Sequence, residues 1–143
     1  MKSPRLYAIG FMVIATAIAC NTRPSEEAET YNKLFDEVIT AHDEIMPAMG
    51  KLNSLSKKLE QEADSTDSSG ILDSLEMSHK AMMDWMKDFS EKFPYGEFNP
   101  KDKTTEEITA KINILEEEKN EVYELRELIS QSIEKAEKLL SEK

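Results

Sequence analysis

Two segments of the chain share the pattern His-x3-Met-x2-Met, which combines an imidazole with thioether sulfur. The pattern supplies His42, Met46 and Met49 in a first motif (residues 42–49), and His79, Met83 and Met86 in a second motif (residues 79–86). On an α-helix, side chains three, four and seven positions apart lie on one face. Each motif therefore predicts a local group of soft donors. Such donors favour Cu(I) or Ag(I) over Mg²⁺ and Ca²⁺, which prefer oxygen.

These residues also have an ordinary structural interpretation. Methionine fills irregular helical cores, and a histidine on an apolar stripe is often a core residue without a ligand. Their distribution along the chain favours metal ligands. All six methionines beyond the N-terminal segment lie between residues 46 and 86, and both histidines of the chain lie in the two motifs. If methionine served only to pack the hydrophobic core, we would expect it on every apolar stripe.

The N-terminal segment has the organisation of a secretory signal peptide. Lys2 and Arg5 precede an apolar stretch, residues 6–19, that is too short for a typical transmembrane helix. Cys20, the only cysteine, follows small residues as in the lipobox of bacterial lipoproteins. We expect a signal peptide at 1–19 and a lipidated Cys20 with a polar tether at 20–25. The alternative is an ordinary cleavable signal with an incidental cysteine.

Removal of residues 1–19 makes an acidic chain still more acidic. The net charge of −11 becomes −13, because 16 basic and 29 acidic residues remain. Such a chain repels nucleic acid and anionic lipid, so neither is an expected partner. If Cys20 is acylated, the mature chain has no free thiol. Thioether ligands suit a compartment outside the cytoplasm, where thiols are readily oxidised.

Three apolar stripes at helical spacing predict an all-α fold. We expect helices at about 26–62, 70–93 and 104–142, the last opening with a capping box at Thr104. Pro47 lies inside the first helix, where it removes a backbone hydrogen bond and predicts a kink. The polar run 63–70 is expected to form the turn between the first two helices.

The expected architecture is a single domain, residues 26–143, folded as an antiparallel up-down-up three-helix bundle with long first and third helices. A turn near residue 66 makes the first two helices antiparallel, so that positions whose numbers sum to about 132 face each other. Met46 is then level with Met86, and Met49 with Met83. Two metal sites follow as a hypothesis: His42, Met46 and Met86 in one, and His79, Met83 and Met49 in the other. Trp85 is close enough in the sequence for its ring to cover a bound cation. Asp43 is close enough to accept a hydrogen bond from the imidazole of a metal-binding histidine.

Enzymatic activity is not expected. The chain has no HExxH zinc motif, no Gly-rich phosphate loop and no cysteine cluster, and it has only four glycines with which to build irregular loops. The run Glu116–Glu118 fits a solvated helix face.

The two motifs behind a lipobox-like segment resemble small helical lipoproteins of Bacteroidota, sometimes labelled viral A-type inclusion proteins. This resemblance covers most of the mature chain and implies an exported helical lipoprotein, but the label carries no mechanism. The donor set is also similar to that of periplasmic proteins that bind Cu(I) or Ag(I) through methionine and histidine. Only the ligand chemistry transfers from those proteins.

The sequence therefore predicts a lipoprotein of the bacterial cell envelope, anchored through Cys20 to a membrane, with the outer membrane favoured. It would bind Cu(I) or Ag(I) for buffering or for delivery to a metal-transfer partner protein. The alternative is a lipid-anchored interaction module, whose methionine-rich face accepts a partner helix or an apolar ligand.

Overall fold

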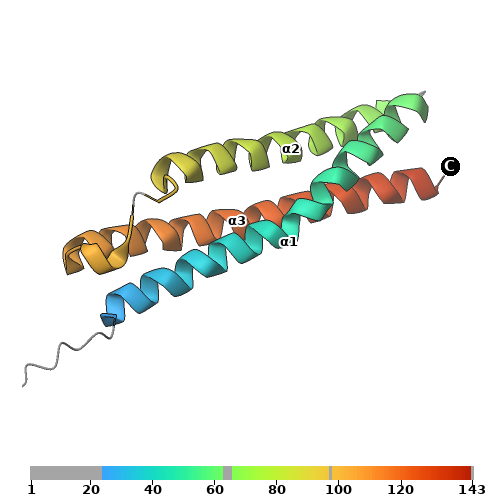
Figure 1. The fold of residues 1–143 in the computed structure, drawn as a ribbon. Helices are drawn as coiled ribbons and strands as arrows, with labels where there is room; N and C mark the ends of the chain where they lie inside the picture. The colour runs from blue at the N-terminus through green and yellow to red at the C-terminus, as the bar shows by residue number, and fades with distance from the viewer. Residues whose placement is uncertain (1–23, 63–65, 97, 143) are drawn as a thin grey trace, which may run out of the picture.

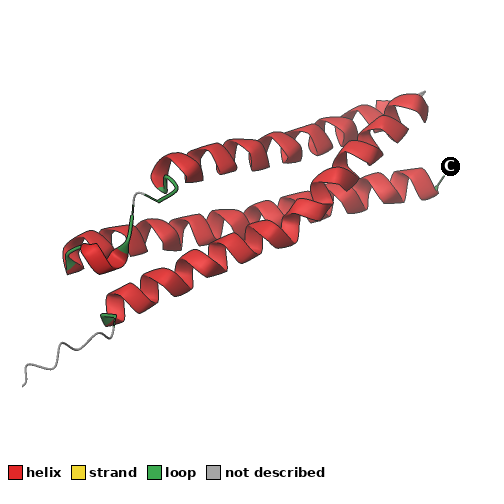
Figure 2. Cartoon of the chain, in the orientation of Figure 1, coloured by secondary structure: helices red, strands yellow, loops and turns green. Residues whose placement is uncertain are grey.

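The computed structural model describes residues 24–62, 66–96 and 98–142. They form three α-helices, α1 (Glu26–Glu62), α2 (Thr66–Lys92) and α3 (Thr105–Ser141), and a short 3-10 helix, η1 (Pro100–Asp102). Helices account for most of this described chain, and the loops lie at their ends (Figure 2).

The helices lie side by side in an up-down-up order (Figure 1). α2 runs back along α1, and α3 returns beside both, parallel to α1. α1 and α3 have 37 residues each and α2 has 27. The expected three-helix bundle with long first and third helices is confirmed.

The helix ends have identifiable caps. The Ser25 hydroxyl accepts a hydrogen bond from the Ala28 N–H at 3.2 Å, so the last tether residue caps α1. The expected capping box of α3 is present, with Thr104 Oγ1 accepting from the Glu107 N–H and the Glu107 carboxylate accepting from the Thr104 N–H. This backbone hydrogen bond holds the pKa of Glu107 below its usual range.

α2 begins at Thr66, four residues before the start expected from the sequence. The polar run that suggests a turn is thus partly helical. Ser68 is 1% exposed, so the start of α2 buries this polar side chain in the bundle. Tertiary packing outweighs the weak helix propensity of this segment.

A row of buried residues at seven-residue intervals runs along each helix. The rows are Val38, Ile45, Leu52 and Leu59 on α1, Leu75, Met82 and Phe89 on α2, and Ile108, Leu115, Val122, Ile129 and Ala136 on α3. The buried side of α2 also includes Ser78 and Trp85, whereas His79 and Met86, which a single apolar seam along this helix would bury, are only half-buried. α2 packs against both α1 and α3, and a stripe facing two neighbours is broader than a simple seam.

Ion pairs fix the parallel register of α1 and α3. Glu37 pairs with Lys119, and Glu44 with Arg126 at 3.5 Å, and in both cases the partners are 82 positions apart. The hydrogen bond from Lys119 holds the pKa of Glu37 below its usual range. These pairs are partly or largely exposed, so they specify alignment more than they add stability.

α1 changes direction near its middle (Figure 1), in the region of Pro47. Proline has no N–H to donate to the carbonyl one turn earlier, and its ring crowds that carbonyl, so a bend at this position is expected. The bend falls within the first motif.

Residues 1–23 are outside the described residues, and with them the predicted signal peptide (1–19), the lipidation site Cys20 and most of the tether. No helix of the described part of the chain has the length and apolar character needed to cross a membrane.

Candidate metal centre

The imidazole of His42 is held in one orientation by its neighbour in the sequence. Its Nδ1 lies 3.0 Å from Oδ1 of Asp43. A carboxylate only accepts hydrogen bonds, so the neutral ring carries its proton on Nδ1 and leaves the lone pair on Nε2. A carboxylate in this position is a common companion of metal-binding histidines, because it fixes the tautomer and raises the basicity of the other nitrogen. The structure thus places Asp43 where the sequence suggested a supporting role.

The other ring nitrogen of His42 has no such partner. Nε2 is buried and makes no hydrogen bond, although the side chain as a whole is 17% exposed. Buried polar atoms are nearly always paired, and each exception calls for an explanation. A nitrogen with a free lone pair, turned away from water and supported from behind by a carboxylate, is suited to a metal ion.

His42 packs on α2 through Trp85. The two rings are stacked, with centroids 5.8 Å apart and an angle of 28° between their planes. The indole Nε1 of Trp85 is likewise buried without a hydrogen-bond partner. Two unpaired ring nitrogens, one from each helix, therefore lie in the same small region of the α1–α2 interface.

This contact shifts the register expected from the sequence. Positions summing to 132 would put His42 level with Ser90, one turn beyond Met86, but it lies against Trp85 instead. Phe35 contacts Phe93 in the same shifted register. The shift brings His42 next to the part of α2 that carries Met86 and moves Met46 away from that level.

The four methionines of the motifs differ in exposure. Met49 is 8% exposed and Met86 is half-buried, whereas Met46 is 40% and Met83 50% exposed. Met82, which is not a motif residue, is completely buried in the core. The predicted donors are thus divided between the interior and the surface, and the two predicted three-ligand sites stay predictions.

His79 has a different environment from His42. It is half-buried and lines two open grooves. One lies between α1 and α2 beside Asn53 and Ser56, and the other lies along α2 and includes Met77 and Met83. The structure therefore brings His79 and Met83 to a common groove, while Met49, the third member of that predicted set, lines neither groove.

Harder donors do not gather in the same way. Within residues 24–62, 66–96 and 98–142, no three side chains of histidine, cysteine, aspartate or glutamate converge enough to hold a metal ion.

The sequence analysis missed an acidic groove between α2 and α3, with Ala81, Trp85, Leu125 and Leu128 among its lining residues. The signal was present in the sequence as carboxylates at positions 84, 88 and 91 and again at 121 and 124, spaced three or four apart. It was not distinguishable there from an ordinary solvated face.

Comparison of the chain with models of known protein families, with curated proteins and with solved structures found no match in any of the three.

Proposed function

We propose that this protein binds a soft monovalent metal ion, Cu(I) or Ag(I), at a site centred on His42. The observation that carries the proposal is that the two ring nitrogens of His42 have different environments. Nδ1 faces the Asp43 carboxylate, and Nε2 is buried without any hydrogen-bond partner. A lone pair preserved in this way costs stability unless something binds to it.

Thioethers complete the proposed coordination. Met46, four positions after His42 on the same face of α1, is the proposed second ligand. Met86, one position after the Trp85 on which His42 stacks, is the proposed third, although in the observed register it lies at a different level of the bundle from Met46. One imidazole and two thioethers are neutral ligands, so they leave the single charge of Cu(I) or Ag(I) uncompensated and give no particular advantage to a divalent ion. Trp85 supplies an aromatic ring near this charge.

The exposure of Met46 supports a role in exchange. Its side chain is 40% exposed, so one ligand of the proposed site is accessible from solvent while the imidazole nitrogen is not. A partner protein with its own soft ligands can approach a metal from that side and take it by ligand replacement. This arrangement favours buffering or delivery over permanent storage.

The proposed cellular setting follows from the N-terminal residues. A lipid anchor at Cys20 is five residues from Ser25, which caps α1. His42 is sixteen residues beyond the start of α1, or about 24 Å along the helix axis. The metal would thus be held within reach of proteins on the same membrane of the cell envelope.

Calorimetric titration of the purified protein with Ag(I), together with competition for Cu(I) against bicinchoninate under reducing conditions, tests the proposal. The wild-type protein should bind one ion tightly at the first site, and His42→Ala should weaken this binding by about 100-fold. His79→Ala is the matched control and should change it by less than about threefold. Trp85 is the only tryptophan, so quenching of its emission reports metal binding at this place.

Helix content and thermal unfolding of both variants should match the wild type, which separates loss of a ligand from loss of the fold. Absence of Ag(I) and Cu(I) binding to the wild-type protein contradicts the proposal. Equal losses in the two histidine variants would contradict the choice of His42 as the centre.

A further inference from the structure

A groove with a volume of ≈ 750 Å³ lies between α2 and α3. Its apolar lining consists of Ala81 and Trp85 on α2 and Leu125 and Leu128 on α3. Trp85 is buried, but Leu128 is 39% exposed, which is unusual for a leucine beside a core aromatic residue. The small side chain of Ala81 leaves space at this level. An apolar floor is therefore accessible from solvent.

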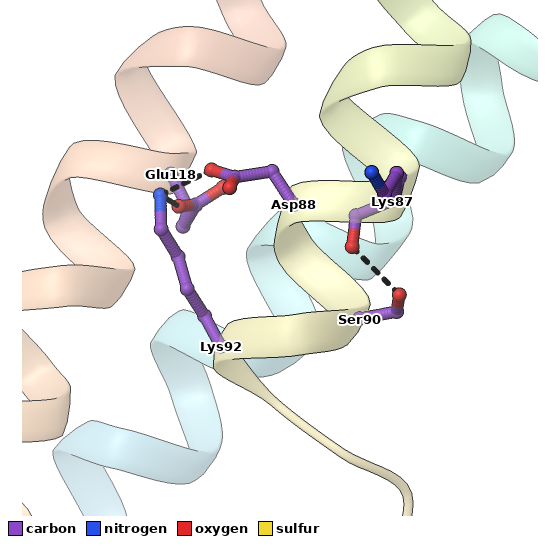
Figure 3. A network of polar contacts seen from close by, with 5 residues as sticks. All are labelled: Lys87, Asp88, Ser90, Lys92 and Glu118. Carbon is purple, nitrogen blue, oxygen red and sulfur yellow. Dashed lines mark hydrogen bonds and ion pairs between the residues drawn. The ribbon is translucent and has the colours of Figure 1, made fainter.

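Polar contacts between α2 and α3 bound this groove at its two ends. At one end the hydroxyls of Ser78 and Ser132 are hydrogen-bonded at 2.7 Å. At the other end Lys92 donates to Glu118 at 2.7 Å and also pairs with Asp88, as Figure 3 shows. The two contacts are fourteen residues apart on each helix, or about 21 Å. Between these contacts the groove lining spans positions 81–91 on α2 and 121–128 on α3, or about 15 Å and about 10 Å, which is two to three turns of a partner helix.

The rim of the groove is strongly negative. Its charged lining comprises one lysine, Lys87, and the carboxylates of Asp84, Asp88, Glu91, Glu121 and Glu124. The three carboxylates on α2 have cation partners on the same helix, Lys80, Lys92 and Lys87. The two on α3 have no ion pair among the described residues.

Two carboxylates in or beside this cluster, Glu121 and Glu118, lie in surroundings that disfavour their negative charge. Partial burial and the negative charge of Glu118 raise the pKa of Glu121, with Lys92 opposing them. Glu118 is itself 0% exposed, and its Oε2 makes no hydrogen bond although Oε1 accepts from Lys92. Glu118 does not line the groove, but its buried charge lies beside it and adds to the negative potential there.

From this geometry we infer that the α2–α3 groove binds a basic amphipathic helix of another protein. Apolar side chains at positions i, i+3 and i+4 of that helix contact Ala81, Trp85 and Leu128, and its lysine or arginine residues pair with Glu121 and Glu124. A second copy of this chain does not fit, because each copy carries a net charge of −11 and the groove would meet another acidic surface. This function is separate from metal binding, although Trp85 contributes to both places.

The test uses a fluorescein-labelled 14-residue peptide of leucine and lysine, designed with leucine on one helical face and lysine on the other. Its binding to the purified protein is followed by fluorescence anisotropy. The double variant Glu121→Gln, Glu124→Gln should weaken binding by about tenfold, and Leu128→Asn by about fivefold. Glu116→Gln, Glu134→Gln removes two charges from elsewhere on α3 and should change the affinity by less than about twofold.

A peptide of the same composition with the leucines dispersed is the control for non-specific attraction. The inference predicts that it binds at least about tenfold more weakly, because charge alone does not fill an apolar floor. Equal binding of the two peptides, or equal losses in the two double variants, overturns the inference. Asp43→Asn, which alters the proposed metal site but keeps the imidazole stacked on Trp85, should leave peptide binding unchanged, so failure of the metal proposal and failure of this one are distinguishable.

Discussion

The first and second motifs share their pattern of histidine and methionine, but the bundle gives them different surroundings. His42 is followed by Asp43, which holds its Nδ1, whereas His79 is followed by Lys80, which pairs with Asp84. One imidazole has a buried free nitrogen against Trp85, and the other lines open grooves. A repeated pattern therefore repeats the donor types without repeating the site. The residues between the donors decide which copy can hold a ligand.

The two motifs share the pattern of buried and exposed positions, because each continues a row of core residues. Ile45 and Met82 occupy the same place in the two patterns, and both are buried at 3% and 0% exposure. The next position in each, Met46 and Met83, is exposed at 40% and 50%. Residues that continue the seven-residue rows face inward, and their neighbours turn outward by about 100°. This much follows from helical periodicity alone.

The largest expected effect tests that common core. Ile45→Ala and Met82→Ala should each lower the free energy of unfolding by about 2–5 kcal/mol, because each leaves a cavity at a fully packed position. Met46→Ala and Met83→Ala should each cost less than about 1 kcal/mol. Urea denaturation followed by circular dichroism measures all four. A large loss for Met83→Ala would show that the motifs are oriented differently from the structure.

A smaller effect addresses the contrast between Asp43 and Lys80. Asp43→Asn should weaken Ag(I) binding by about tenfold, since an uncharged partner no longer favours the tautomer with a free Nε2. Lys80→Gln removes the charge of the corresponding residue of the second motif without adding a soft ligand, and should leave the affinity unchanged. Calorimetric titration of both variants measures the difference. If the two substitutions act alike, the carboxylate has no special part in the site.

Methionine oxidation should sharpen the comparison further. In the metal-free protein, hydrogen peroxide should oxidise the exposed Met46 and Met83 at similar rates, and faster than the buried Met49 and Met82. One equivalent of Ag(I) should slow the oxidation of Met46 by about fivefold, because coordination withdraws electron density from the sulfur and shields it from the oxidant, and should leave Met83 unaffected. Peptide mass spectrometry after timed exposure provides the rates. Protection of Met83 alone would place the metal at the second motif.

The smallest expected effect on stability comes from the third position of the motifs, which is Glu44 in the first and Ala81 in the second. Glu44 reaches across to Arg126 of α3, whereas Ala81 leaves the α2–α3 groove open. Glu44→Gln should lower the free energy of unfolding by less than about 1 kcal/mol, and high salt should abolish the difference, because the pair is exposed. A larger loss that persists in salt would show a buried contribution.

Helical periodicity and turn residues predicted the helices, their order and most of the core. The start of α2 was not predictable in this way, since Ser68 is polar in the sequence and buried only by the fold. The burial of Ser78 and Trp85 in place of His79 and Met86 has a similar cause. A single stripe on α2 cannot reveal that the helix has two neighbours, each burying a different flank.

The candidate site was predictable in composition and less so in geometry. The pattern identified His42, and the sequence placed Asp43 beside it, but the free Nε2 depends on the contact with Trp85. The observed register follows from where the two helices end: α1 ends at Glu62 and α2 begins at Thr66, so positions whose numbers sum to about 128 face each other, as Phe35 and Phe93 do. The sequence placed the turn too far along the chain because the polar start of α2 does not reveal that it is helical.

Because α1 and α3 run parallel, the start of α1 and the end of α3 lie far apart. Glu26 and Ser141 lie at opposite ends of the bundle (Figure 1), separated by the length of a 37-residue helix, about 55 Å. If the chain is held at a surface through its first residues, as proposed, the start of α1 is the near end of the bundle and the end of α3 is the far end. A fluorophore attached beyond Ser141 could measure the distance of that far end from the surface directly.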